Sequence, residues 1–218
     1  YTGEDTLSLH DALPIFFYEI TPKDNSKAQI TQFLQSRHHG NSGIIYCLSR
    51  KNVEDMADWL CEIGYNALPY HAGLSPKVRE RNQAQFLREE NIIMCATIAF
   101  GMGIDQPDVR LVVHYQMPAN IDSLYQEMGR AGRDGKDSTC LMLYSSKDKG
   151  LQSYFIQSSD APQPIKNSRW RTLEALVHYS EGGECRHAEI LTYYKDSQRI
   201  TNCGHCDSCV PLSHRKIQ

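Results

Sequence analysis

The sequence predicts an α/β fold, in which a parallel-sheet lobe is followed by a small helical domain. Between Phe16 and Tyr144, short apolar segments alternate with helical segments of about a dozen residues, which is the pattern of a parallel sheet covered on both faces. Beyond residue 150 the sequence shows helical patterns only and ends in a cluster of cysteines. The 218 residues are enough for two small domains, and two are expected.

Five apolar segments are expected to form the strands of the sheet. They are residues 15–20, 43–48, 92–96, 110–115 and 139–144. The helix after the second segment has one apolar face, which we assign to the core and which consists of Val53, Met56, Ala57 and Leu60. Ser75 and Pro76 have the residue types of an N-cap and a first helical position, so a further helix is expected to begin there.

The second domain is expected to be a pair of helices. Residues 145–150 read as a turn, Pro162 and Pro164 as a junction, and Ser168 as the N-cap of the first helix, while the second helix begins at about Cys185. The apolar residues expected to form the contact between the two helices are Trp170, Leu173, Leu176 and Val177 on the first and Ile190, Leu191 and Tyr194 on the second.

The segment QEMGRAGRDG at residues 126–135 contains the most informative pattern of the chain. Arg130 and Arg133 are three residues apart and can reach one anion together. A guanidinium keeps its charge at physiological pH and offers a planar fork of donors, which suits the charge of a phosphoryl group in transfer. The alternative for so short a pattern is a surface turn with two solvated arginines.

The whole segment resembles motif VI of superfamily 2 helicases, and its ending is similar to the RecQ family. That resemblance implies a RecA-like lobe, the helicase C-terminal domain, followed by an α-helical zinc-binding domain. It also implies catalytic roles for three residues when ATP and Mg²⁺ are bound. Arg133 would be the arginine finger, Arg130 a phosphate contact, and Gln126 a bridge to the attacking water or phosphate.

Residues 95–115 resemble motif V of the same family. The resemblance implies that Thr97 contacts a nucleic-acid phosphate and that Gly103 and Asp105 lie at the nucleotide cleft. By itself, Asp105 would be read as a turn aspartate ahead of Pro107. The position of motif VI downstream favours the functional interpretation.

Two further segments, residues 42–60 and 70–76, resemble motif IV and the family element that follows it. Ser49 and Arg50 stand at the carboxyl end of an expected strand, where open parallel sheets place their ligands. The resemblance implies that these two residues, with His71 and Gly73, lie near the DNA backbone. A lone histidine such as His71 is more often packed or solvated, so its assignment rests on the resemblance.

Four cysteines are clustered near the end of the chain. Cys203, Cys206 and Cys209 are each separated by two residues, and Cys185 stands at an expected helix start. Four soft ligands at this spacing predict a structural zinc ion, as the resemblance also implies, whereas a disulfide framework is the alternative. His205 is a conceivable further ligand, although its place suits an exposed loop better. The scattered Cys47, Cys61, Cys95 and Cys140 are expected to be buried thiols or surface bystanders.

The resemblance implies the C-terminal part of an ATP-dependent 3′–5′ DNA helicase of DNA repair and recombination. The 218 residues contain no GxxxxGKS or GxxxxGKT phosphate loop and no DExH string, so a first lobe is the expected partner and the fragment alone is expected to be inactive. The alternatives are a non-catalytic zinc-containing interaction module or an RNA helicase lobe. We expect four divisions of the chain. Residues 1–15 are an atypical lead segment, suspected to be a truncated or foreign-joined start. The RecA-like lobe covers residues 16–150, the helical hairpin with the four-cysteine zinc-binding domain covers 151–210, and a tail covers 211–218.

The charge and apolar content of the chain limit its partners. The net charge of −3 provides no global attraction to DNA, so binding to single strands or junctions must come from local contacts. Arg169, Arg171 and Arg186 could contribute, but the solvated side of a helix is the expected place for them. No segment approaches the ~18 apolar residues of a membrane span. We therefore expect a soluble protein of the bacterial cytoplasm and nucleoid or of the eukaryotic nucleus.

Overall fold

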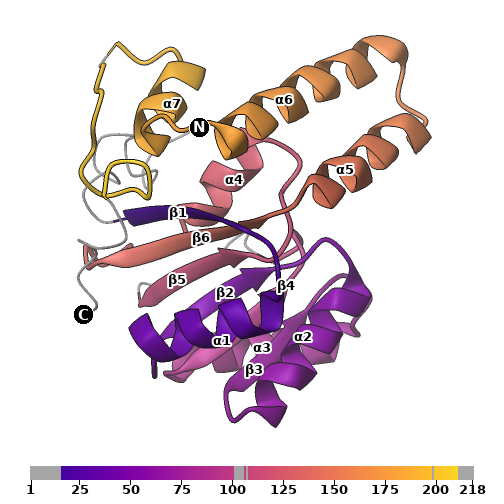
Figure 1. Ribbon diagram of the computed structural model, residues 1–218. Helices are drawn as coiled ribbons and strands as arrows, with labels where there is room; N and C mark the ends of the chain where they lie inside the picture. Colours follow the sequence, from indigo (N-terminus) through magenta and orange to yellow (C-terminus); the bar gives the residue numbers. More distant parts are fainter. Residues whose placement is uncertain (1–15, 101–105, 107, 198, 211–218) are drawn as a thin grey trace, which may run out of the picture.

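The computed structural model describes residues 16–100, 106, 108–197 and 199–210, so the segments 1–15 and 211–218 lie outside the described residues. Six parallel strands form one sheet in the order β1-β6-β5-β2-β4-β3 (Figure 1). The strands are β1 (Phe16–Pro22), β2 (Ser42–Tyr46), β3 (Asn66–Tyr70), β4 (Ile92–Ala96), β5 (Val109–His114) and β6 (Ser138–Tyr144).

Helices cover both faces of the sheet, as expected for parallel strands. The helices of this lobe are α1 (Ser26–Arg37), α2 (Arg50–Glu62), α3 (Pro76–Arg88) and α4 (Ile121–Met128). Side chains of α1 and α2 belong to the hydrophobic cluster on one face, and side chains of α3 and α4 to the cluster on the other. The four residues expected on the core face of α2 are buried, and Ser75 is the N-cap of α3 with Pro76 in its first turn.

One strand was missing from the sequence prediction. β3 is a five-residue edge strand that contains Pro69, and it pairs with β4 only. Proline lacks the backbone N–H that a central strand needs, but an edge strand tolerates it. The short, partly exposed segment therefore lacks the apolar pattern by which the other strands were found.

The helical part begins earlier than the sequence indicated. Its helices are α5 (Ser146–Ser158), α6 (Gln163–Glu181) and α7 (Arg186–Tyr193). The expected turn at residues 145–150 is wrong, because the Ser145 side chain caps α5 there. The expected N-cap Ser168 is also wrong: it lies inside α6, whose cap position is Pro162. None of the helices in the described ranges is long and apolar enough to cross a membrane.

The helical part packs on the sheet as well as on itself. Leu173 and Leu176 of α6 and Ile190 of α7 belong to the same buried cluster as Tyr18 of β1 and Tyr46 of β2. The expected contact between the two helices is therefore only part of their packing. In Figure 1, α6 and α7 lie above α4 and the β1 edge of the sheet.

The cysteine loop is attached to the edge strand β1. The Tyr18 backbone N–H donates to the His205 carbonyl at 3.1 Å, and the Tyr18 carbonyl accepts from the Asp207 N–H at 2.8 Å. Arg186 is buried and donates to both carboxylate oxygens of Asp207, at 2.8 and 3.2 Å. The expectation that Arg186 lies on a solvated helix side is therefore wrong. Through its hydrogen bonds to Asp207, Arg186 holds the cysteine loop in place.

Candidate functional site

The segment with the two arginines follows directly after α4. Its turn is made by Gly132 and Gly135, both in the left-handed region with φ of 61° and 79°, where glycine is favoured. The Gly132 N–H donates to the carbonyl of Val109 on β5 at 2.9 Å, which attaches the turn to the sheet. Arg133 is exposed, with its Nε donating to the Gly129 carbonyl at 3.4 Å. Its guanidinium is thus presented at the surface.

Arg110 holds the end of this turn. Its side chain, which is 10% exposed, donates to Asp134 at 2.5 Å and to Asp108 at 3.0 Å. Hydrogen bonding and the positive charge of Arg110 lower the pKa of Asp134, although burial opposes them. The aspartate that follows Arg133 is therefore held by Arg110, while Arg133 itself is exposed.

Arg130 interacts with Tyr46, which belongs to a group of buried polar side chains next to α4. His114 of β5 forms a contact of 2.7 Å between its Nε2 and Oε2 of Glu127, and its ring stacks on Tyr46 at 5.6 Å. Burial raises the pKa of Tyr46, and the charge and hydrogen bond of Arg130 oppose this rise. Gln126, on the same helix, is exposed. The three predicted catalytic residues thus belong to one short segment, in which Arg130 is anchored and Gln126 and Arg133 are exposed.

The residues predicted to contact nucleic acid lie after three strands that are neighbours in the sheet. Ser49 and Arg50 follow β2, Thr97 follows β4, and Gly73 lies shortly after β3. A Cβ added to Gly73 would stand 3.0 Å from the Arg50 side chain, so these two residues are in contact range. The Thr97 N–H donates to the Tyr70 carbonyl at 3.2 Å, which joins two of the loops. The strand order β2-β4-β3 therefore gathers these residues on one edge.

His71 is placed differently from its four companions. Its side chain is 4% exposed, its Nε2 lies 3.0 Å from Oε1 of Glu54 on α2, and its Nδ1 accepts from the Gly73 N–H at 3.1 Å. The ring thus shapes the loop that contains Gly73. Ser49 in turn caps α2 by accepting from the Asn52 N–H. Gly103 and Asp105, the residues predicted at the nucleotide cleft, lie outside the described residues.

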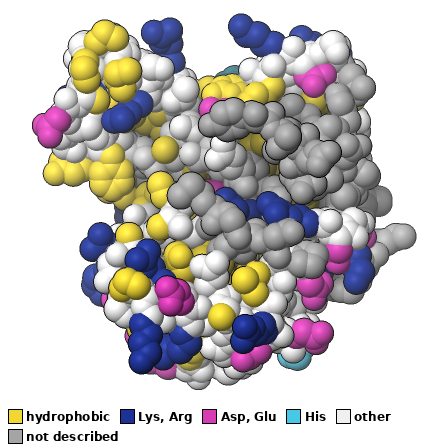
Figure 2. Space-filling model, turned by 180° about the vertical axis from the view of Figure 1, so that it is seen from behind, with side chains coloured by type: hydrophobic (Ala, Val, Ile, Leu, Met, Phe, Trp, Pro, Cys, Tyr) yellow, Lys and Arg dark blue, Asp and Glu magenta, His cyan; other side chains and the backbone are white. Residues whose placement is uncertain are grey.

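A pocket of about 370 Å³ lies between these strand ends and the α5–α6 hairpin. Its lining includes Thr97, Ile98 and Asn120 on the sheet side and Phe155 and Arg169 on the hairpin. Figure 2 shows apolar side chains gathered over the hairpin, where the exposed large apolar residues are Tyr154, Phe155 and Ile165. Arg169 forms no ion pair with the described part of the chain.

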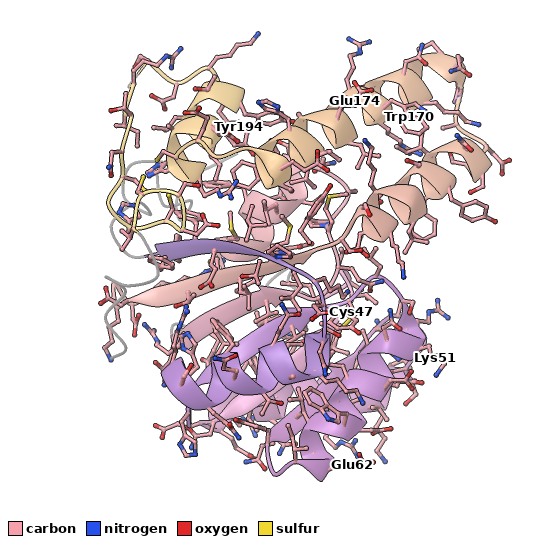
Figure 3. The ribbon with its side chains drawn as sticks, in the orientation of Figure 1. Cys47, Lys51, Glu62, Trp170, Glu174 and Tyr194 are labelled. Atoms are coloured by element: carbon pink, nitrogen blue, oxygen red, sulfur yellow. The ribbon has the colours of Figure 1, made fainter. Side chains whose placement is uncertain are left out.

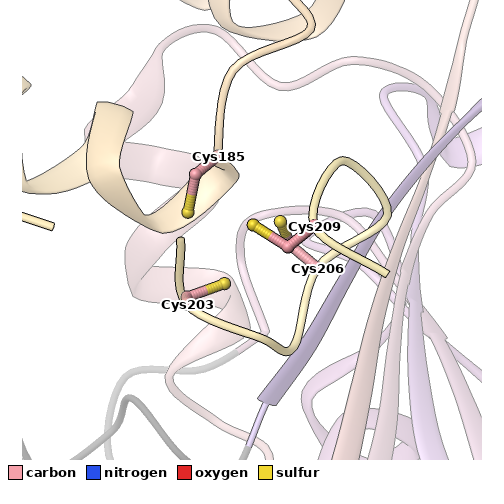
Figure 4. Close-up of side chains that lie close together, drawn as sticks. All are labelled: Cys185, Cys203, Cys206 and Cys209. Atoms are coloured by element: carbon pink, nitrogen blue, oxygen red, sulfur yellow. The ribbon is translucent and has the colours of Figure 1, made fainter. Parts of the chain in front are cut away.

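The four clustered cysteines converge on one point. The Sγ atoms of Cys185, Cys203, Cys206 and Cys209 all lie within 4.8 Å of one another (Figure 4). Four thiolates around one zinc ion at about 2.3 Å would be separated by about 3.8 Å, so the cluster fits with small adjustments. A hydrogen bond from Cys203 lowers the pKa of Cys206 to about 5, although burial opposes it. The thiol group most protected from solvent is thus disposed to be a thiolate.

Two histidines lie beside this cluster. Ligand atoms of His187, Cys203 and His205 also lie within 4.8 Å of one another, and the two rings are 5.7 Å apart. His187 is 1% exposed and His205 is half-buried against Tyr18, so the exposed loop position expected for His205 is not what the structure has. Outside the cluster, the described cysteines are Cys47, Cys61, Cys95 and Cys140. Cys61 is exposed and the other three are buried.

Sequence profiles of two protein families match the chain. The helicase conserved C-terminal domain matches residues 25–135, and the RecQ zinc-binding domain matches residues 146–210. The chain belongs to the RecQ family of helicases. The resemblance of the sequence to this family is confirmed, as is the order of a RecA-like lobe followed by a helical zinc-binding domain.

Sequence relatives agree with the RecQ family assignment, and a solved structure shares the fold of the lobe. The chain is 40% identical to the RecQ-like DNA helicase BLM of Xenopus laevis over 91% of its own length and 15% of the relative. It is 38% identical to the ATP-dependent DNA helicase RecQ of Haemophilus influenzae over 90% of its own length and 31% of that relative. The Escherichia coli DEAD-box protein SrmB, bound to RraA, has the same fold, with a TM-score of 0.55, 24% identity and coverage of 68% of this chain and 88% of that one.

Sequence reasoning overlooked the buried polar residues that hold α4. Glu127 falls on the apolar stripe of the helix with Ile121, Leu124 and Met128, all four of them buried. A carboxylate on such a stripe needs a partner, because an unpaired buried charge is strongly unfavourable. The position of Glu127 on the stripe therefore indicated that a buried partner was needed. The identity of that partner, His114, thirteen residues earlier, was visible only in the fold.

Proposed function

We propose that this chain is the second motor lobe of an ATP-dependent 3′–5′ DNA helicase that acts in DNA repair and recombination, together with the zinc module, residues 146–210, of that helicase. The chain spans 15% and 31% of the Xenopus and Haemophilus relatives, whose names describe DNA helicases. In the whole protein, ATP with Mg²⁺ would lie between a first lobe and this one. The 3′–5′ direction of movement is inferred from the family likeness alone, and none of the residues described above determines it.

In this proposal the segment after α4 acts on the nucleotide. Arg133 is the arginine finger, since it is exposed and its guanidinium fork suits the charge that spreads over a phosphoryl group in transfer. Arg130 contacts a phosphate from its anchored position, and Gln126 orients the attacking water or a phosphate. Gly103 and Asp105 would complete the nucleotide cleft.

The edge that carries Ser49, Arg50, Gly73 and Thr97 holds the DNA backbone. Single-stranded DNA and duplex junctions are the proposed partners. Backbone amides, hydroxyls and one arginine suffice to position phosphates without reading sequence. His71 supports this edge by shaping the loop rather than by lying open to solvent. Because the net charge is −3, affinity depends on these few contacts and falls as salt rises.

The zinc ion is assigned to Cys185, Cys203, Cys206 and Cys209. Four thiolates leave no open coordination position, so the metal has a structural role. These cysteines join the start of α7 to the loop attached to β1. When bound, zinc would supply folding free energy in addition to the packing of this module on the sheet and its hydrogen bonds to β1.

One observation carries the proposal: the loops after three neighbouring strands and the arginine segment after α4 belong to a single sheet-centred lobe of a RecQ-family chain. A lobe with both features can couple nucleotide contact to movement along a strand. The test is an ATPase assay with and without single-stranded DNA, performed on the 218 residues alone and on the chain joined to the first lobe of a RecQ relative.

We expect no turnover from the 218 residues, because they contain no phosphate loop, and DNA-stimulated turnover from the joined protein. Turnover by the 218 residues alone would contradict the two-lobe proposal. A folded, joined protein that binds DNA but never hydrolyses ATP would favour a non-catalytic module. An RNA arm with the same sequence distinguishes a DNA-dependent from an RNA-dependent enzyme.

A further inference from the structure

Helix α4 is held by the zinc module at its first turn. Oδ2 of Asp122 accepts a hydrogen bond from the Tyr193 hydroxyl at 2.9 Å, and Oδ1 accepts one from the Tyr194 hydroxyl at 3.0 Å. Both oxygens of one carboxylate are thus occupied by donors from two consecutive residues. Hydrogen bonds to a charged group are stronger than those between neutral groups.

Aromatic packing reinforces this contact. The Tyr194 ring meets the Tyr125 ring edge-on at 5.6 Å, and Tyr125 lies one turn after Asp122 on α4. The Tyr193 and Tyr194 rings are perpendicular, 5.1 Å apart. Figure 3 labels Tyr194 on the α7 side, next to α4. The pair therefore grips one face of α4 by both hydrogen bonds and ring contacts.

Helix α7 connects this grip to the cysteines. Cys185 is the N-cap of α7, Tyr193 is its last residue and Tyr194 its C-cap. An eight-residue helix is about 12 Å long and stiff. One end of α7 thus belongs to the metal centre and the other end to α4, which leads within two residues of its end to Arg130.

We propose that Asp122, Tyr193 and Tyr194 are positioning residues, through which the metal-loaded cysteine module orients α4 and with it Arg130 and Arg133. The proposal rests on the functions proposed above for the cysteines and arginines. It gives the zinc module a second task besides its own folding. Loss of zinc releases α7, and the release is transmitted to the arginine segment by the loss of two hydrogen bonds to Asp122.

The test is hydrogen exchange on the zinc-loaded 218-residue chain, comparing the wild type with the double variant Tyr193→Phe/Tyr194→Phe. Phenylalanine keeps the rings and removes only the hydroxyl donors. We expect unchanged zinc content and unchanged exchange in β5 and β6, with exchange over residues 121–135 accelerated at least about tenfold. Tyr154→Phe, on a tyrosine that is 63% exposed, is the matched control.

A chelator arm tests the link to the metal. Removal of zinc should accelerate exchange over residues 121–135 in the wild type and have little additional effect there in the double variant. Unchanged exchange over 121–135 in the double variant overturns the proposal, and so does acceleration that is uniform over the whole sheet, because either result excludes a specific grip on α4. If the double variant does not fold, Asp122→Asn, which keeps one acceptor, is used in its place.

An activity readout separates this proposal from the function proposed above. In the protein joined to a first lobe, the double variant should lower kcat for ATP about tenfold with little change in KM, as expected for misplaced rather than missing arginines. Normal turnover in Arg133→Ala would remove the arginine role while leaving the exchange result intact. Normal kcat in the double variant, with Arg133→Ala inactive, would overturn only the positioning role.

Discussion

His114 on β5 and Glu127 on α4 form a buried pair beneath the arginine segment, with 2.7 Å between Nε2 and Oε2. Their side chains are only 1% and 8% exposed. The pair connects the sheet to the one helix that leads into Arg130 and Arg133. The stability of this connection and the chemistry of the segment above it can be tested separately.

Glu127→Ala should lower the free energy of unfolding of the zinc-loaded chain by about 3 kcal/mol, because it leaves the buried His114 without its partner. Glu127→Gln should cost less, since the amide keeps the size and one acceptor. Urea unfolding measures both changes. Glu90→Ala, at an exposed position, should change stability by less than about 0.5 kcal/mol. Equal effects of Glu127→Ala and Glu90→Ala would show that the pair contributes nothing.

Arg133→Ala, in the chain joined to a first lobe, should reduce kcat for ATP hydrolysis by on the order of 10³-fold and affect nucleotide binding much less. Arg133→Lys should rescue poorly, because an ammonium does not reproduce the guanidinium fork. Arg88→Ala, an exposed arginine at the end of α3, is the control. Steady-state kinetics decide the outcome. If Arg130→Ala abolishes turnover while Arg133→Ala does not, the two proposed roles must be exchanged.

Elemental analysis should find about one zinc ion per chain, and Cys206→Ser should remove it. Chelation should also accelerate exchange of the Tyr18 amide, which is bonded to the His205 carbonyl at 3.1 Å. His205→Ala should retain the metal. Loss of zinc in His205→Ala, together with full retention in Cys185→Ser, would instead favour the neighbouring histidine group as the ligand set.

His38 should make the chain less stable in mild acid. Burial lowers its pKa to about 4, although the hydrogen bond to Asn41 opposes the change, and the charges of Arg37 and Arg110 add to the lowering. The unfolded chain binds the proton at about 6.5 and the folded chain only at about 4, so protonation favours unfolding. The stability contribution is complete above about pH 6.5 and is lost as the pH falls toward 4, by about 3 kcal/mol in total.

The His38 effect is isolated by comparing the wild type with His38→Gln at pH 7.5 and at pH 5. Zinc release in acid affects both chains and cancels in the difference between them. The glutamine variant should lose less stability between the two pH values than the wild type does. Equal losses would show that His38 titrates normally in the folded chain.

Local sequence patterns determined much of this protein. Five of the six strands, the core face of α2 and the cap of α3 follow from apolar periodicity and from the residue types at helix starts, which act within a few neighbouring residues. The cysteine cluster was equally visible, because three of its members lie within seven residues. The family likeness rested on contiguous motifs of the same kind.

Only the tertiary structure decided how these pieces meet. The contacts of Glu127 with His114, of Asp122 with Tyr193 and Tyr194, and of Arg186 with Asp207 join residues 13 to 72 positions apart. Whether a charged or polar side chain is solvated or buried depends on which distant segment packs on it. Residue type and spacing do not contain that information. For this reason Arg186, expected in solvent, is buried against Asp207. Likewise, α4 is held through Asp122 by two tyrosines that follow 71 and 72 positions later in the chain.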